Sequence, residues 1–338
     1  MSKKTLVLTY NYTSIRNVAE DIATVLRENG ERVLVTTEPT LLPEADKLVV
    51  FVPFAPPLLS NYLYAYYIFK GEKYFYTTAD GVPLIYGLNQ YLLNQITFIP
   101  NSKFTARNLQ EAGLSTDLPV FHGVDFSKIE RARPLAEKLK QKLDRDFPNS
   151  VRFGVVTGTT KRKNVDLLVE TFKVLNEQFP DEAKDIHFFV ISHKSFKDLT
   201  VPANVHFVAE FGLNPHEYIF AFYQAMDYIV VPSGTEGFGL PVLEAMACGT
   251  PVIHQLIPPF DEFTSWQYNF LVQPKNVEEY IDKDRAQKWR IYRFDPLDMA
   301  FAIISAKNSQ DREERSEKLK EIARAYDIRI LYKRFVSE

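Results

Sequence analysis

Two glutamates, Glu236 and Glu244, stand eight residues apart around a turn that contains two glycines. The apolar run at residues 228–232 before the turn indicates a short buried strand, and residues 242–247 after it indicate a helix of small side chains. The free N–H groups and the dipole at the start of a helix form a site for an anion such as a phosphate. Glu244 lies about 7 Å further along the helix axis, where a carboxylate can accept hydrogen bonds from a ribose diol. This arrangement suits a sugar nucleotide.

The turn itself has two interpretations. Gly237 and Gly239 flank Phe238, and their missing Cβ atoms let backbone N–H groups approach a ligand closely. Glu236 would then hold hydroxyl groups of whatever the phosphate carries. The alternative is an ordinary strand–turn–helix unit with two solvated glutamates, because glycine turns of this kind are common.

The composition narrows the class of protein. A chain of 338 residues suits two domains of about 150 residues each, and a net charge of −3 gives no positive field for nucleic acid. The single cysteine, Cys248, rules out an internal disulfide and is expected to fill buried space rather than act as a nucleophile. Because the first ten residues run into a strand without a signal-peptide region, we expect a cytoplasmic protein.

Alternating strand and helix patterns predict an α/β fold with doubly wound parallel sheets. In the first half we expect strands at residues 5–10, 32–37, 47–52, 73–77 and 97–99, and helices at 14–29 and 102–112. In the second half we expect strands at 151–157, 186–192, 205–208, 228–232, 251–253 and 268–273, and helices at 164–178, 215–225, 242–247, 296–307 and 312–326. The charged segment 127–148 reads as a helix or a linker, and the domain boundary falls near residue 148.

Aromatic residues crowd into one short segment. Residues 48–69 are apolar, but three prolines interrupt them, so they predict a strand at 47–52 that ends in a proline loop and no transmembrane helix. Core packing, stacking on an acceptor sugar and docking at a bilayer surface remain open as roles for the aromatic side chains. The residues concerned are Tyr62, Tyr64, Tyr66, Tyr67, Phe69, Tyr74, Phe75 and Tyr76.

The segment at residues 232–253, PSGTEGFGLPVLEAMACGTPVI, resembles the signature of the retaining glycosyltransferases of family four. That family has the GT-B architecture, in which two Rossmann-like domains face a cleft. In the family, the first glutamate binds the transferred sugar and the second binds the nucleotide ribose. The resemblance therefore implies these roles for Glu236 and Glu244, with backbone donors from Gly237, Phe238, Gly239 and Leu240.

The resemblance also implies the division of the chain. Residues 1–148 would form the acceptor domain, 149–310 the nucleotide-sugar donor domain, and 311–338 C-terminal helices that cross back to the first domain. The crossing helix is expected at residues 321–335. Residues 121–125, FHGVD, resemble the element that ends the family's first domain, with His122 in place of the usual asparagine.

A loop at residues 155–164, VVTGTTKRKN, resembles the phosphate-binding loop of the family. Lys163 matches the family's lysine, but Gly158 or its neighbour stands where the family has an arginine. Either Lys161 or Arg162 substitutes for that arginine, or the site has one cation fewer. Cations beside a pyrophosphate would stabilise the leaving group; alternatively, Lys161 and Arg162 form a solvated loop edge.

Other parts of the site are implied by position. Glu210 and Phe211 occupy the place of a loop that faces the nucleotide base in relatives. Asp80 lies in a loop where relatives often carry a histidine near the sugar, and we take it as an acceptor-side residue; the alternative is a turn aspartate before a glycine. Glu262, in a proline–glutamate element, is expected to cap the helix of its own loop.

Together these features imply a retaining glycosyltransferase that moves a hexose from a nucleotide diphosphate sugar to a hydroxyl of a sugar, lipid or protein acceptor. Glu236, Lys163 and Asp80 are the predicted catalytic residues. The family's front-face mechanism requires neither metal nor cofactor, and the sequence has no zinc-binding pattern and no DxD-type motif in a convincing loop. We expect no nucleic-acid partner, and peripheral membrane contact is one option for the aromatic segment.

Two alternatives follow from the departures from the family pattern. The missing arginine and histidine are compatible with a catalytically silent nucleotide-sugar-binding protein. Another GT-B enzyme, such as a sugar-nucleotide epimerase or a phosphorylase, is the second alternative, although the paired glutamates argue against it. The sequence does not specify the sugar, the base, the acceptor or the oligomeric state.

Overall fold

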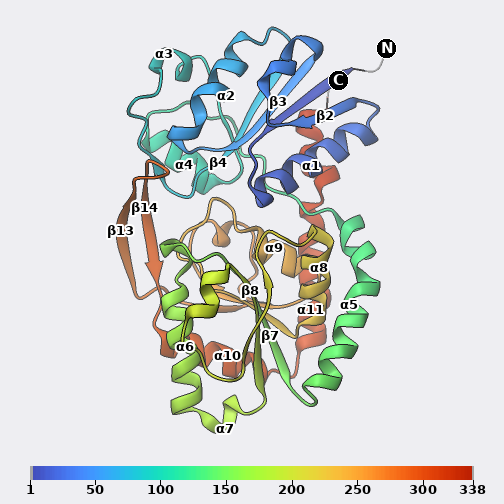
Figure 1. The fold of residues 1–338 in the computed structure, drawn as a ribbon, viewed down its shortest axis with the longest axis vertical. Helices are drawn as coiled ribbons and strands as arrows, with labels where there is room; N and C mark the ends of the chain where they lie inside the picture. Colours follow the sequence, from blue (N-terminus) through green and yellow to red (C-terminus); the bar gives the residue numbers. More distant parts are fainter. Residues whose placement is uncertain (1–2, 337–338) are drawn as a thin grey trace.

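The computed structural model describes residues 3–336 and contains two parallel sheets, one in each half of the molecule (Figure 1). The first sheet has the strand order β2-β1-β3-β4-β6, which is the flavodoxin-like variant of a doubly wound fold. Its strands are β1 (Lys4–Thr9), β2 (Arg32–Thr36), β3 (Lys47–Pro53), β4 (Glu72–Thr78) and β6 (Ile99–Pro100). In the centre of the register, Val7 of β1 lies opposite Val49 of β3.

The second sheet has the order β12-β11-β10-β7-β8-β9, which is the Rossmann order 3-2-1-4-5-6. Its strands are β7 (Val151–Val156), β8 (Ile186–Ser192), β9 (Val205–Glu210), β10 (Tyr228–Val231), β11 (Val252–Gln255) and β12 (Phe270–Val272). The predicted fold class of two doubly wound domains is therefore confirmed. Ligands of such sheets bind beyond the carboxyl ends of the strands where the strand order reverses, here between β7 and β10.

Helices cover both sheets. Those of the first half are α1 (Thr13–Glu28), α2 (Pro56–Ile68), α3 (Gln90–Leu93) and α4 (Lys103–Glu111). Those of the second half are α6 (Val165–Gln178), α7 (Pro180–Ala183), α8 (His216–Ala225), α9 (Leu240–Ala247), α10 (Pro296–Lys307) and α11 (Arg312–Ala323). The segment read as a helix or linker is helical, as α5 (Phe126–Asp146), and it packs against α8. The predicted domain boundary thus falls between α5 and β7.

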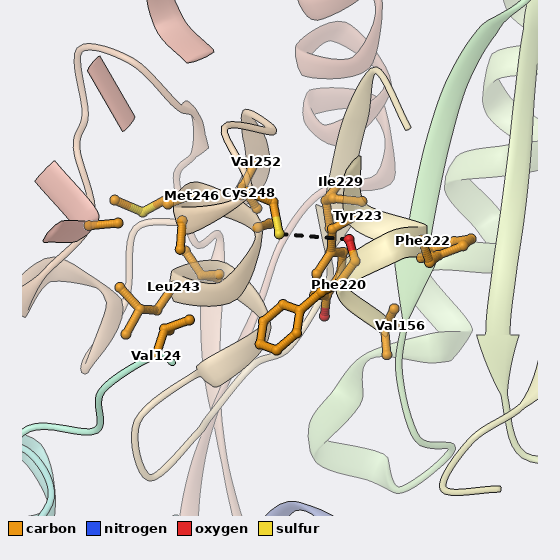
Figure 2. Close-up of a cluster of buried hydrophobic side chains, with 14 of the residues drawn as sticks. Val124, Val156, Phe220, Phe222, Tyr223, Ile229, Leu243, Met246, Cys248 and Val252 are labelled. Atoms are coloured by element: carbon orange, nitrogen blue, oxygen red, sulfur yellow. Dashed lines mark hydrogen bonds between the residues drawn. The ribbon is translucent and has the colours of Figure 1, made fainter. Parts of the chain in front are cut away.

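A buried apolar cluster packs α9 against α8 (Figure 2). It joins side chains of α8, such as Phe220 and Tyr223, to Leu243 and Met246 of α9. Cys248 belongs to this cluster, with its Sγ 3.8 Å from the carbonyl oxygen of Phe220, and burial raises the pKa of its thiol. The expectation that this cysteine fills buried space is confirmed.

The proline loop expected after β3 is in fact the start of a helix. α2 begins at Pro56, where proline is tolerated because the first helical N–H groups have no partner within the helix. The helix divides the aromatic segment: Tyr62 is buried, whereas Tyr64 and Tyr67 are exposed. Part of the segment is therefore core, as the packing interpretation predicts. Among the described residues, no helix is long and apolar enough to cross a membrane.

The C-terminal segment crosses back to the first domain as predicted, but not as one helix (Figure 1). After α11 the chain forms a short 3-10 turn, and α12 (Ile328–Leu331) and a second 3-10 turn follow. Asp327 interrupts the helix because its side chain caps α12, accepting a hydrogen bond from the N–H of Arg329 at 2.8 Å. Tyr332 and Phe335 are buried in the core that also contains α1.

A third, small sheet was not predicted. The hairpin of β13 (Asn276–Asp282) and β14 (Gln287–Arg293) extends from the second domain, and β14 pairs antiparallel with β5 (Val82–Pro83) of the first domain. Figure 1 shows this hairpin on the left, bridging the two halves. Alternation of apolar and polar residues around the turn sequence DKDRA was the signal available for it.

Candidate active site

The turn between β10 and α9 lies where the second sheet reverses its strand order. Gly239 precedes α9 in the left-handed conformation with φ of 100°, and a Cβ atom there would lie 2.1 Å from the ring of Phe260. Only glycine meets both conditions without strain. Pro241 then occupies the first turn of the helix. The local sequence thus presents the start of α9 at the edge where a ligand of this fold binds.

Glu236 is buried in this turn and is paired with two cations. Arg162 donates from Nη1 to Oε2 of Glu236 at 2.8 Å, and Lys163 donates to Oε1. Burial by itself raises the pKa of Glu236, but the charges of Lys163 and Arg162 outweigh it and lower the pKa to about 2. Glu236 is therefore an ionised hydrogen-bond acceptor at neutral pH.

Arg162, one of the two predicted substitutes for the family's arginine, extends towards Glu236. Its guanidinium reaches Glu236 and also donates to the carbonyl oxygen of Thr235 at 3.0 Å. The N–H of Gly234 donates to the carbonyl oxygen of Arg162 at 2.8 Å, which fixes the loop against the end of β10. The Nε atom of Arg162 is buried and has no hydrogen-bond partner among the described residues.

The other two members of the predicted phosphate loop lie differently. Lys161 is half exposed and points to the hairpin, 3.2 Å from Glu278 and above the ring of Tyr280. The structure therefore does not bring Lys161 to the site. Gly158 is buried at the end of β7, and a Cβ atom there would lie 3.3 Å from the ring of His193.

Asp80 reaches the site from the first domain. Its Oδ1 accepts a hydrogen bond from the N–H of Gly237 at 2.9 Å. Its Oδ2 lies 3.2 Å from Nη2 of Arg162 and accepts from Nη1 of Arg285 at 3.0 Å. The three predicted catalytic residues, Glu236, Lys163 and Asp80, thus form one charged cluster. Arg285 was missed, because nothing local marks a residue in a hairpin turn as part of a distant site.

Glu244 lies on the other side of the turn, facing a cavity between the two domains. Its Oε1 is 2.7 Å from Nε2 of His216. Burial lowers the pKa of His216, but the carboxylates of Glu244 and Asp21 raise it, and the net pKa lies above the usual value. Leu240 and Phe211 line the same cavity, as does Thr13 of the first domain. Glu210 lies differently: the nearest cation to its carboxylate is Lys194, at 3.6 Å.

Asp21 and His216 were not predicted. Asp21 is buried on the inner face of α1, paired with Lys128 of α5, and burial raises its pKa to about 6 although Lys128 and His216 act against the shift. A charged residue on an otherwise apolar helix face was the signal available for Asp21. His216 carried no signal, because its partners come from α1 and α9.

Two further predicted residues join the domains. The ring of Phe238 is buried, 5.2 Å between centroids from His122 of the first domain and 4.7 Å from Phe263, so that only its backbone can meet a ligand. Glu262 does not cap its own loop helix. Instead it accepts hydrogen bonds from the N–H groups of Lys103 and Phe104, both at 2.7 Å, and so caps α4 of the first domain. The correction has a simple cause: the start of α4 faces this loop across the interface.

Comparison with solved structures places the fold among the GT-B glycosyltransferases. The chain is similar to Anabaena Alr3699/HepE, crystallised in complex with UDP and glucose, with a TM-score of 0.68, 16% identity and 98% of both chains covered. It is also similar to the sucrose-phosphate synthase of Thermosynechococcus elongatus, with a TM-score of 0.69, 14% identity, and 99% of this chain and 97% of that chain covered. These likenesses show the fold.

Sequence comparison then identifies the family. The family model described as glycosyl transferases group 1 matches residues 140–285. Glycosyltransferase 335 of Sulfolobus islandicus rod-shaped virus 1 is 65% identical over 333 residues, which cover 98% of this chain and 99% of that protein. The D-inositol 3-phosphate glycosyltransferase of Frankia alni is 30% identical over 141 residues, 39% of this chain and 34% of that protein. The chain belongs to the group 1 glycosyltransferases and is a glycosyltransferase enzyme.

Proposed function

We propose that this glycosyltransferase moves a hexose from a nucleotide diphosphate sugar to an acceptor hydroxyl, with retention of configuration and without a metal ion. The observation that carries the proposal is the convergence of Arg162 and Lys163 on Glu236 at the turn that leads into α9. The complex of HepE with UDP and glucose supports a nucleotide-sugar donor.

Each group has a role in this scheme. The diphosphate lies at the start of α9, where the helix dipole and the charges of Lys163 and Arg162 offset its charge. Glu236 holds hydroxyl groups of the hexose, and Glu244 accepts hydrogen bonds from the ribose. The charge that a metal ion would otherwise supply beside the leaving group comes from the two cations.

The bond changes follow from the protonation states. The bond between C1 of the sugar and the diphosphate oxygen breaks, and the acceptor oxygen bonds to C1 on the same face. The acceptor proton passes to the leaving phosphate oxygen. Glu236 is a poor base because two cations lower its pKa to about 2. Catalysis then consists of positioning and of stabilisation of the leaving group.

The acceptor is a hydroxyl of a sugar, a lipid or a protein. Tyr64 and Tyr67 are the exposed part of the aromatic segment, and they lie on α2 of the predicted acceptor domain. Stacking on an acceptor sugar and contact with a bilayer both remain predictions for these side chains.

Thermal shift and turnover with a panel of UDP-, GDP- and ADP-sugars test the proposal. We expect one base to raise the melting temperature and the matching nucleotide sugar to be hydrolysed slowly without acceptor, both also in EDTA. Glu244→Ala should weaken nucleotide binding, whereas Glu236→Ala should depress turnover more than binding. Glu130→Ala, at an exposed position on α5, is the matched control. Unchanged binding and turnover in both site variants would refute the assignment, and dependence on a divalent ion would refute metal independence.

A further inference from the structure

The β13–β14 hairpin is attached to the first domain directly beside Asp80. Gln287 lies opposite Pro83 and Lys288 opposite Val82, and Val82 is only two residues beyond Asp80. The N–H of Leu84 donates to the carbonyl oxygen of Ala286 at 2.8 Å, which ties the hairpin turn to the same loop. The segment that carries Asp80 is therefore held by backbone hydrogen bonds from the other domain.

Tight packing fixes this attachment. A Cβ atom at Gly81 would lie 2.4 Å from the carbonyl oxygen of Lys288 and 2.5 Å from Cδ1 of Trp289, so the two backbones leave no room for a side chain. Trp289 is buried, and its Nε1 donates to Oε1 of Gln287 at 2.9 Å. Gln287 in turn donates to the carbonyl oxygen of Phe54 at 2.6 Å.

Trp289 lies against two guanidinium groups that share one carboxylate. The Cζ atoms of Arg162 and Arg285 are each 5.9 Å from the centroid of its ring, within the range of cation–π attraction. Both groups contact Oδ2 of Asp80. The N–H of Arg285 also donates to Asp282 at 3.0 Å, which shapes the hairpin turn. Asp80 thus lies between two guanidinium groups, and both of these groups pack against the ring of Trp289.

Arg162 contacts two carboxylates at once. Its Nη1 reaches Glu236 while its Nη2 reaches Asp80. With Arg285 present, Asp80 has a second cation, and Arg162 can remain on Glu236. Without Arg285, Arg162 would be the only ion-pair partner of Asp80 among residues 3–336, and the position of Asp80 against the N–H of Gly237 would loosen.

We propose that Arg285 is a positioning residue of the transfer reaction: it holds Asp80 on the N–H of Gly237 and thereby fixes the Glu236 turn that receives the donor sugar. This inference rests on the proposed function. It assigns part of the active site to the hairpin, which contributes a side chain across the domain interface.

The test combines a structural and a kinetic readout on the full-length protein. Hydrogen–deuterium exchange is measured on peptides covering residues 235–240 in the wild type, Arg285→Gln, Arg285→Lys, Asp80→Asn and the double variant Asp80→Asn/Arg285→Gln. Arg290→Gln is the matched control, because this hairpin residue pairs with Glu111 and does not contact Asp80. UDP release from UDP-glucose, or from the sugar nucleotide that the donor panel selects, gives kcat and KM.

We expect faster exchange of the 235–240 segment in Arg285→Gln and Asp80→Asn, wild-type exchange in Arg290→Gln, and partial rescue by Arg285→Lys. Arg285→Gln should lower kcat about tenfold with KM changed less than threefold, and the double variant should be no slower than Asp80→Asn. Equal exchange in Arg285→Gln and Arg290→Gln, or multiplying losses of kcat in the double variant, would overturn the inference. If no donor turns over, the proposed function fails, while the exchange data still decide the role of Arg285.

Discussion

Replacing His122 with asparagine should make the protein more resistant to acid. His122 is buried between the domains, 2.7 Å from the hydroxyl of Tyr76 and 3.0 Å from Nδ2 of Asn101. Burial lowers the pKa of its imidazole to about 3. The unfolded chain takes up a proton near pH 6.5, but the folded chain does not, so stability is lost as the pH falls from 6.5 towards 3.

The size of the effect follows from linkage. Over the roughly 1.5 pH units between pH 6.5 and pH 5, this imidazole is protonated in the unfolded state and neutral in the folded state. The free energy of unfolding therefore falls by about 2 kcal/mol between pH 7 and pH 5. Asparagine does not titrate, and therefore His122→Asn removes this loss. His254, whose pKa burial lowers to about 4, produces a similar loss that remains in the variant.

Urea unfolding at pH 7 and pH 5, followed by circular dichroism, measures the difference. We expect the free energy of unfolding to fall by about 2 kcal/mol less in His122→Asn than in the wild type over this interval. His193→Asn, at an exposed histidine, is the control and should behave as the wild type does. An equal fall in His122→Asn and the wild type would show that this imidazole is not held neutral.

Two further predictions concern the domain interface. Glu262→Gln removes a charge that caps α4 across the interface, and it should lower the free energy of unfolding by about 1 kcal/mol in the urea assay. The control is Asp261→Asn, at the exposed neighbouring residue. An equal effect of the two substitutions would contradict the capping role. Gly81→Ala forces a Cβ atom into the backbone of β14 and should cost about 1–3 kcal/mol together with most of the turnover. Gly87→Ala is the control, because its Cβ atom would meet open space and its only cost is backbone strain at φ of 83°. If Gly87→Ala lost as much turnover as Gly81→Ala, this result would argue against a specific role for the hairpin contact.

The parts of the site that could be predicted are those encoded locally. Glu236, the glycine turn and Glu244 lie within one strand–turn–helix unit, so their spacing along the chain determines their spacing in space. Lys163 was predictable for the same reason, because its loop joins β7 directly to α6. The local alternation of strands and helices also predicted that the sheets are parallel, because such alternation leaves few other topologies.

The parts that could not be predicted depend on contacts between distant segments. Arg285 and Asp80 are separated by more than half of the chain, and only the pairing of β14 with β5 brings them together. Glu262 was assigned to the wrong helix because the sequence does not show which helix start its loop faces. α2 was missed because an apolar segment interrupted by prolines carries no helical periodicity that separates it from a loop.

The departures from the family pattern are physically connected. An aspartate at position 80, where relatives often carry a histidine, brings a second carboxylate beside Glu236, and two buried anions repel unless cations offset them. The guanidinium of Arg162, four residues after Gly158, contacts both carboxylates, and Arg285 balances the charge of Asp80 from across the interface. A change at Asp80, Arg162 or Arg285 therefore alters the electrostatic environment of the other two residues.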